Sequence, residues 1–137
     1  MIAVKSIVQA LAVSLIAVGA AAAEDAPLPP GNAEAGATVF KKCLACHQIG
    51  PTAKVSVGPV LNGVVGRKAG TYPNYAYSPA NKNSGITWDE ATLAKYLPNP
   101  QAFLPGTKMT FAGLPKPQEV ADVIAFLKQY DEAGNKK

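Results

Sequence analysis

The chain has 137 residues, a length that favours a single domain. Its formal net charge is +4, with Arg67 as the single arginine, and it contains one histidine and two cysteines. So mild a basic excess argues against nucleic-acid binding and is compatible with a partner that carries an acidic patch.

The first 23 residues have the pattern of a secretory signal peptide. Lys5 precedes an apolar run from Ile7 to Ala23, and Ala21 and Ala23 form an A-x-A cleavage signal. An uncleaved anchor is the alternative, although this run is at the short edge of what spans a bilayer. We expect cleavage after Ala23, a periplasmic mature protein and no stable membrane insertion. Export would expose both cysteines to oxidising conditions, where they pair unless another group consumes them.

We expect the mature chain to form a flexible lead-in, one domain and a polar tail, at 24–30, 31–131 and 132–137. The proline-rich segment EDAPLPPGN, which contains this lead-in, is typical of irregular chain. The first helix is predicted from 33 to 43, because Asn32 can cap it and apolar residues follow at its end.

A second helix is predicted over 87–97, where Thr87 and Glu90 form a T-x-x-E capping box and Pro98 ends the helix. A third is predicted over 117–130, because apolar residues recur there at helical spacing. Its apolar face consists of Val120, Val123, Ile124 and Leu127.

The segment 48–86 is irregular for 39 residues and rich in Gly, Pro and Asn. Compact domains rarely contain so long an irregular segment unless it is functional or wraps something. Three short helices also provide little apolar surface, and small domains often need a metal or another staple. A large apolar cofactor would supply the missing core.

The stretch CLACH contains both cysteines and the histidine, as Cys43, Cys46 and His47. A C-x-x-C pair can be a disulfide or a thioredoxin-like dithiol, but the dithiol starts a helix after a strand. Here the pair follows a predicted helix. Zinc needs four ligands, and neighbouring Cys46 and His47 could both bind it only with strain.

C-x-x-C-H is also the attachment signature of c-type haem. In helical geometry Cys43 and Cys46 lie on one face, where they can form thioethers to the two vinyl groups of a porphyrin. His47 can then bring its imidazole beneath the iron. Of these readings, haem also accounts for the irregular segment 48–86.

Met109 is the only methionine besides Met1 and lies in FLPGTKMTFAG. A lone methionine is usually core filler. This one follows Pro105 and Gly106 in a predicted loop, which favours a second axial ligand to the haem iron. His/Met ligation leaves no open coordination position and is typical of electron transfer rather than catalysis.

The chain resembles the class I c-type cytochromes, particularly mitochondrial cytochrome c and the short cytochromes c of alphaproteobacteria. The resemblance extends from about 31 to 130 and includes CLACH, GPVLNGVVGRKAG, YAYSPANKNSGITW, YLPNPQAFLPGTKM and TFAG. It implies an all-α cytochrome c fold, with three main helices and loops wrapped around one covalently bound haem. It also implies that Gly36 and Phe40 cross the last helix near Phe126.

The resemblance assigns roles to individual residues. Cys43 and Cys46 would form the thioethers, with His47 and Met109 as axial ligands, and the Pro59 carbonyl would accept a hydrogen bond from His47. The resemblance would place Arg67, Tyr77 and Trp88 near the haem propionates. Asn81, Tyr96 and Thr107 would form the polar network around the buried propionate and the methionine sulfur. Phe111 would cover the haem edge.

The residues alone leave alternatives open for four of these positions. Trp88 and Tyr96 could be core aromatics, Asn81 a turn residue and Arg67 a solvated surface charge.

Lysines could surround the exposed haem edge and steer the protein to acidic docking surfaces, although solubilising charge explains most exposed lysines. The candidates are Lys41, Lys42, Lys54, Lys108 and Lys116. The sequence departs from the mitochondrial pattern at Gln101 and Ala102, where lysines are usual, so partner binding is expected to be weaker.

Together these features predict a monomeric periplasmic electron carrier, not an enzyme. The resemblance implies a quinol-oxidising membrane complex as donor and a terminal oxidase or photosynthetic reaction centre as acceptor. The alternatives are a peroxidase-like haem enzyme and an electron-donor subunit of a periplasmic dehydrogenase.

Overall fold

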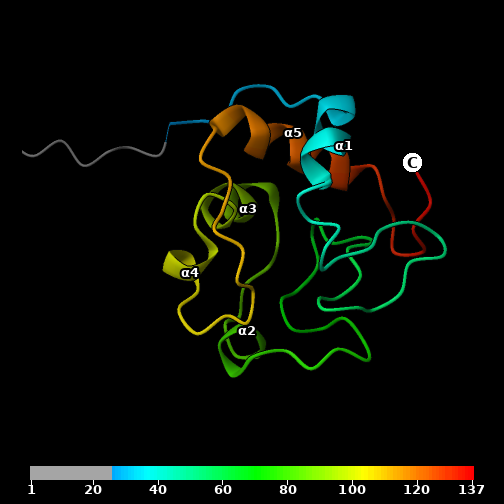
Figure 1. Cartoon of the computed structure of the whole chain (residues 1–137), viewed down its shortest axis with the longest axis vertical. Helices are drawn as coiled ribbons and strands as arrows, with labels where there is room; N and C mark the ends of the chain where they lie inside the picture. The colour runs from blue at the N-terminus through cyan, green and yellow to red at the C-terminus, as the bar shows by residue number, and fades with distance from the viewer. Residues whose placement is uncertain (1–25) are drawn as a thin grey trace, which may run out of the picture.

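The computed structural model describes residues 26–137, so the predicted signal peptide lies outside the described part of the chain. Five helices occur within this range, joined by long irregular segments (Figure 1). They are α1 (Ala33–Phe40), α2 (Pro79–Lys82), α3 (Glu90–Tyr96), α4 (Pro100–Phe103) and α5 (Pro117–Lys128). Between residues 26 and 137 the only β pairings are isolated bridges, and the all-α prediction is confirmed. No helix in this range is long and apolar enough to span a membrane.

Helices α1 and α5 cross in close contact at one end of the molecule (Figure 1). A Cβ atom added to Gly36 would lie 2.0 Å from the carbonyl oxygen of Asp122, so only glycine allows the two backbones to approach this closely. The rings of Phe40 and Phe126 lie 5.0 Å apart beside this contact. The expected crossing of Gly36 and Phe40 over the last helix is confirmed.

Helix α1 begins as predicted, because the side chain of Asn32 accepts a hydrogen bond from the Ala35 amide at 2.9 Å. Its predicted end at Cys43 is wrong by three residues. After Phe40 the amides of Lys42 and Cys43 bond to carbonyls three residues back, which tightens the chain into turns.

The capping box predicted for α3 is also wrong. The cap is Asp89, whose carboxylate accepts from the Thr92 amide at 2.7 Å. Thr87 instead pairs with Lys68 in an isolated bridge, and the Trp88 amide donates to the carbonyl of Arg67. This extended pairing moves the cap from Thr87 to Asp89, and the helix begins at Glu90, three residues later than predicted.

Helix α5 presents the predicted apolar face to the core. Its members are almost completely buried, with exposed fractions of 0% for Val120, 1% for Val123, 4% for Ile124 and 5% for Leu127. Helices α2 and α4 were not predicted, because each has only four residues and no room for a periodic pattern.

Both ends of the domain pack against the rest of the molecule. Leu28 contacts the core, and the Pro30 carbonyl accepts a hydrogen bond from the side chain of Gln118 on α5. At the other end, the tail folds back through a bridge between Tyr130 and Lys136, and Gly134 is buried against the carbonyl of Gly50. The tail therefore packs against the loop that follows CLACH.

Candidate functional site

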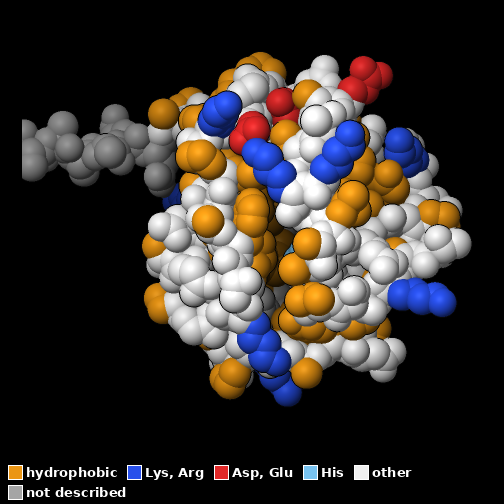
Figure 2. All heavy atoms as spheres, viewed as in Figure 1, with side chains coloured by type: hydrophobic (Ala, Val, Ile, Leu, Met, Phe, Trp, Pro, Cys, Tyr) orange, Lys and Arg blue, Asp and Glu red, His pale blue; other side chains and the backbone are white. Residues whose placement is uncertain are grey.

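A cavity of about 340 Å³ lies at the centre of the fold and opens on one face as a cleft with apolar walls and lysines nearby (Figure 2). Its floor includes the core residues Leu93, Leu97, Leu114, Val123 and Leu127. The structure brings all twelve predicted site residues to this one cavity: Cys43, Cys46, His47, Pro59, Arg67, Tyr77, Asn81, Trp88, Tyr96, Thr107, Met109 and Phe111.

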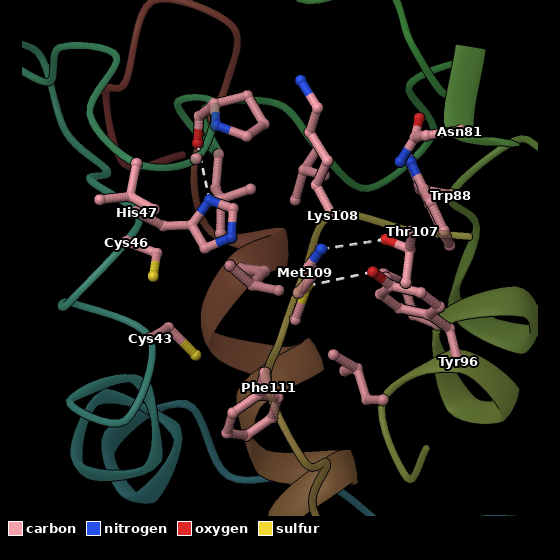
Figure 3. A pocket seen from close by; sticks show the side chains of 18 of the residues that line it. Cys43, Cys46, His47, Asn81, Trp88, Tyr96, Thr107, Lys108, Met109 and Phe111 are labelled. Atoms are coloured by element: carbon pink, nitrogen blue, oxygen red, sulfur yellow. Dashed lines mark hydrogen bonds between the residues drawn. The ribbon is translucent and has the colours of Figure 1, made fainter. Parts of the chain in front are cut away.

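The turn after α1 places both cysteines and the histidine on one wall (Figure 3). The amides of Cys46 and His47 both donate to the carbonyl of Cys43, at 3.1 and 2.9 Å. Both cysteines are free thiols. Burial and the neighbouring Cys46 raise the pKa of the Cys43 thiol to about 11, against a smaller opposing effect of Lys42. Such a thiol is protonated at neutral pH, unlike the activated thiol of a dithiol oxidoreductase.

The His47 ring has a fixed orientation. Its Nδ1–H donates to the carbonyl oxygen of Pro59 at 2.7 Å, which leaves Nε2 free to bind a metal on the side of Met109 (Figure 3). Burial lowers the pKa of His47, more than the Pro59 hydrogen bond raises it, and favours the neutral imidazole. Gly58 lies against the ring, because a Cβ atom there would be 2.6 Å from Cε1. The sequence interpretation missed Gly58, although its place directly before Pro59 was a possible signal.

Met109 lies on another wall of the cavity, where two polar groups contact it (Figure 3). The Tyr96 hydroxyl donates to the Met109 sulfur at 3.0 Å, and the Met109 amide donates to Thr107 Oγ1 at 3.2 Å. Burial raises the pKa of Tyr96, so its hydroxyl is protonated and able to donate at neutral pH. The Tyr96 ring is 4.6 Å from that of Trp88 and 5.8 Å from that of Phe103. Tyr96 therefore has two roles: its ring packs in the core, and its hydroxyl makes a polar contact with Met109.

Polar side chains gather at a further part of the cavity lining. Arg67 donates from Nη1 to the carbonyls of Val60 and Asn62, at 3.0 and 3.2 Å, and lies over the Tyr72 ring. Burial lowers the Arg67 pKa. The Tyr77 hydroxyl accepts from the Tyr72 amide at 3.1 Å. Arg67 is therefore half-buried and bonded, and the alternative of a solvated surface charge is wrong.

The side-chain oxygen of Asn81 is buried and has no hydrogen-bond partner within the described chain. Buried polar groups are nearly always satisfied, so this one indicates a partner supplied by a bound group. A half-turn of the side-chain amide exchanges its oxygen and its nitrogen, so the same side chain can also donate a hydrogen bond to a carboxylate.

The fold surrounds an apolar cavity with C-x-x-C-H at its edge, a candidate sulfur ligand and a buried oxygen without a partner. These features indicate a haem protein of the c type. Comparison with known proteins agrees with this class. The Cytochrome c family model matches residues 33–131. The chain belongs to the cytochrome c family.

Its relatives include bacterial and plant members. Cytochrome c2 of Rhodomicrobium vannielii is 65% identical over 97 residues, which are 71% of this chain and 78% of that protein. Cytochrome c of Cannabis sativa is 52% identical over 102 residues, which are 74% of this chain and 92% of the plant protein. The solved structure of cytochrome c2 from Rhodospirillum centenum aligns with this chain at a TM-score of 0.71 and 43% identity. The alignment covers 74% of this chain and 99% of the Rhodospirillum chain.

Membership of this family means that the protein carries one covalent haem c, attached through Cys43 and Cys46, and is an electron-transfer protein. The residues present fit the group. The thiols lie on the cavity wall, the absence of a side chain at Gly58 makes room for the His47 ring, and Asn81 has a buried side-chain oxygen without a partner.

Proposed function

We propose that the mature protein is a periplasmic carrier of single electrons whose haem iron is ligated by His47 and Met109. The observation that carries the proposal is their placement in one apolar cavity, with the free Nε2 of His47 on the side of the Met109 sulfur (Figure 3). The bound haem supplies an iron that changes its oxidation state by one electron.

The protein's own groups support both ligands in either oxidation state. The Pro59 carbonyl orients His47, while Tyr96 and Thr107 hold Met109 through its sulfur and amide. The mainly apolar walls would keep water away from the bound haem. Because none of these contacts requires a change of ligand, little structural reorganisation should accompany each transfer.

This ligation also argues against the alternative of a peroxidase-like enzyme. Such an enzyme needs an open coordination position for its substrate, and a bound Met109 would fill that position.

We further propose transient docking, as a monomer, to acidic surfaces of membrane redox complexes. The donor would be a quinol-oxidising complex, and the acceptor a terminal oxidase or a photosynthetic reaction centre. Among the proposed docking lysines, Lys42 and Lys108 line the cavity. Lys42, however, forms an ion pair with Glu119 at 3.0 Å, and Lys108 donates to the Ala76 carbonyl at 2.6 Å. Each therefore also has an internal structural role.

The oxidised wild-type protein should show the weak far-red band of an Fe–S(Met) bond in its visible spectrum. Met109→Ala should abolish the band, bind imidazole or cyanide readily, and lower the reduction potential, because the sulfur ligand favours the reduced iron. The protein should also be oxidised by membranes of its host. A wild-type spectrum at neutral pH without the band, together with peroxidase turnover, would instead favour the enzyme.

A further inference from the structure

Met109 has a third contact, which comes from a residue outside the cavity lining. The side-chain amide nitrogen of Gln101 donates a hydrogen bond to the Met109 carbonyl oxygen. Gln101 is exposed and does not line the cavity, whereas Tyr96 and Thr107 do. Met109 is therefore held at its amide, its sulfur and its carbonyl by three side chains from different parts of the chain.

The chain around Met109 depends on such side-chain contacts. Residues 105–116 contain no helix or strand. Within residues 26–137, this stretch bonds to other backbone through the amides of Thr107 and Leu114, which donate to Leu104 and Leu97, and through the Lys116 carbonyl at the start of α5. No such bond fixes the stretch from 108 to 113, where Met109 lies, so side chains must restrict its movement.

Gln101 lies on a short helix that is held in place by packing and by a capping hydrogen bond. It belongs to α4, where Pro100 is buried and the Phe103 ring packs against Tyr96 at 5.8 Å. The Asn99 side chain caps the helix by accepting from the Ala102 amide at 3.1 Å. Phe103 and Gln101 are on the same short helix. Helix α4 therefore contacts Tyr96, whose hydroxyl bonds to the Met109 sulfur, and also supplies the amide that bonds to the Met109 carbonyl.

We propose that Gln101 is a positioning residue for the axial ligand Met109. Its hydrogen bond holds the Met109 backbone from the side away from the cavity and reduces the population in which the sulfur has left the cavity. This inference rests on the proposed ligation by Met109. Lys108, which donates to the Ala76 carbonyl, is a second tether on the same stretch, so removal of Gln101 should loosen Met109 without releasing it.

The test uses the oxidised haem protein and imidazole, a ligand that binds the iron only when Met109 has left. Gln101→Ala removes the donor. Gln101→Glu keeps the length of the side chain but replaces the donor with an acceptor. Ala102→Glu is the matched control, because it adds the same charge at the next position, which is exposed and whose methyl side chain has no hydrogen bond to lose. Imidazole affinity, the far-red band and the reduction potential are measured for each protein, and denaturant unfolding checks the global fold.

Both Gln101 variants should bind imidazole about three- to tenfold more tightly than wild type, because one hydrogen bond of ordinary strength no longer opposes opening. The effect of Gln101→Glu should be at least as large as that of Gln101→Ala. Ala102→Glu should remain within about twofold of wild type, since its charge acts from a distance and is screened by salt.

Two results would overturn the role of Gln101 while leaving Met109 ligation intact. One is a normal far-red band in all proteins with unchanged imidazole affinity in both Gln101 variants. The other is an equal effect of Gln101→Glu and Ala102→Glu, which would assign the change to charge. If wild type itself lacks the band, the proposed ligation fails, and the inference fails with it.

Discussion

At the scale of the residue, the site depends on the groups that hold the two proposed ligands, His47 and Met109, as much as on these two side chains themselves. His47 is oriented by the carbonyl of Pro59 and by the close approach of Gly58. Met109 is contacted by Tyr96 and Thr107. Under the proposed ligation by His47 and Met109, these contacts would hold both ligands in place when the iron changes charge, and so would limit the rearrangement that accompanies each electron transfer.

Gly58→Ala tests the contact with His47. The new Cβ atom would lie 2.6 Å from the ring, so the ring must tilt or the loop must shift, and the hydrogen bond to Pro59 weakens in either case. We expect a loss of about 1–3 kcal/mol in the free energy of unfolding, as for other overpacked sites. The reduction potential should also change, because the bond to Pro59 tunes the basicity of the imidazole.

Gly85→Ala is the control for this variant. Gly85 has a φ of +69° and open space where a Cβ atom would lie, so alanine is strained there without touching His47. A cost of about 1–2 kcal/mol with an unchanged reduction potential is expected. A potential that shifts equally in both variants would contradict the role given to Gly58.

At the scale of the element, the α1–α5 crossing positions the haem-attachment sequence. Cys43 follows α1 by a single turn, and α5 contributes Val123 and Leu127 to the cavity. The buried carboxylate of Asp122 joins the residue that caps α1 to this crossing, because it accepts hydrogen bonds from the Asn32 amide and from the Gln118 side chain. The crossing therefore connects the N-terminal segment, the attachment turn and the cavity wall.

Gly36→Ala should separate the two helices. Alanine is intrinsically better than glycine in a helix by about 1 kcal/mol. At this position its Cβ atom would meet the Asp122 carbonyl at 2.0 Å, so we expect a net loss of about 2 kcal/mol or more in the free energy of unfolding, measured with guanidinium chloride. The exposed Ala37→Gly on the same helix should cost only about 1 kcal/mol. Unchanged or increased stability of Gly36→Ala would show that the crossing tolerates a wider spacing.

At the scale of the whole molecule, the fold is a shell of short helices and long loops around a central cavity (Figure 1). The cleft opens on a face with lysines nearby (Figure 2). Such a distribution of charge would steer the open edge of the site toward acidic partners at low ionic strength. The Lys42–Glu119 pair shows that part of this positive charge is compensated within the molecule.

Lys42→Glu should slow the oxidation of the reduced protein by host membranes about three- to tenfold at low salt. At high salt its rate should approach that of wild type, because charges are screened over about 10 Å at an ionic strength of 0.1 M. Lys137→Glu makes the same change of charge at the exposed C-terminus, away from the cavity lining, and should have a much smaller effect. Equal slowing in the two variants would assign the effect to net charge, and salt-independent rates would remove steering altogether.

The attachment chemistry, the amphipathic α5 and the long irregular segment could be predicted from the sequence. Each depends on neighbours along the chain: the spacing in CLACH, a helical period, or a run rich in Gly and Pro. The resemblance of its motifs also selected a set of residues that the structure brings to one cavity. Helix ends were less predictable, since α3 starts at Glu90 only because Trp88 pairs with a distant strand-like segment. Gly58 against His47 and Gln101 on the Met109 carbonyl were decided by the tertiary structure alone. Both contacts join residues eight or more positions apart. The place of Gly58 directly before Pro59 marks it as a candidate, but no local pattern encodes which side chain a folded loop will meet.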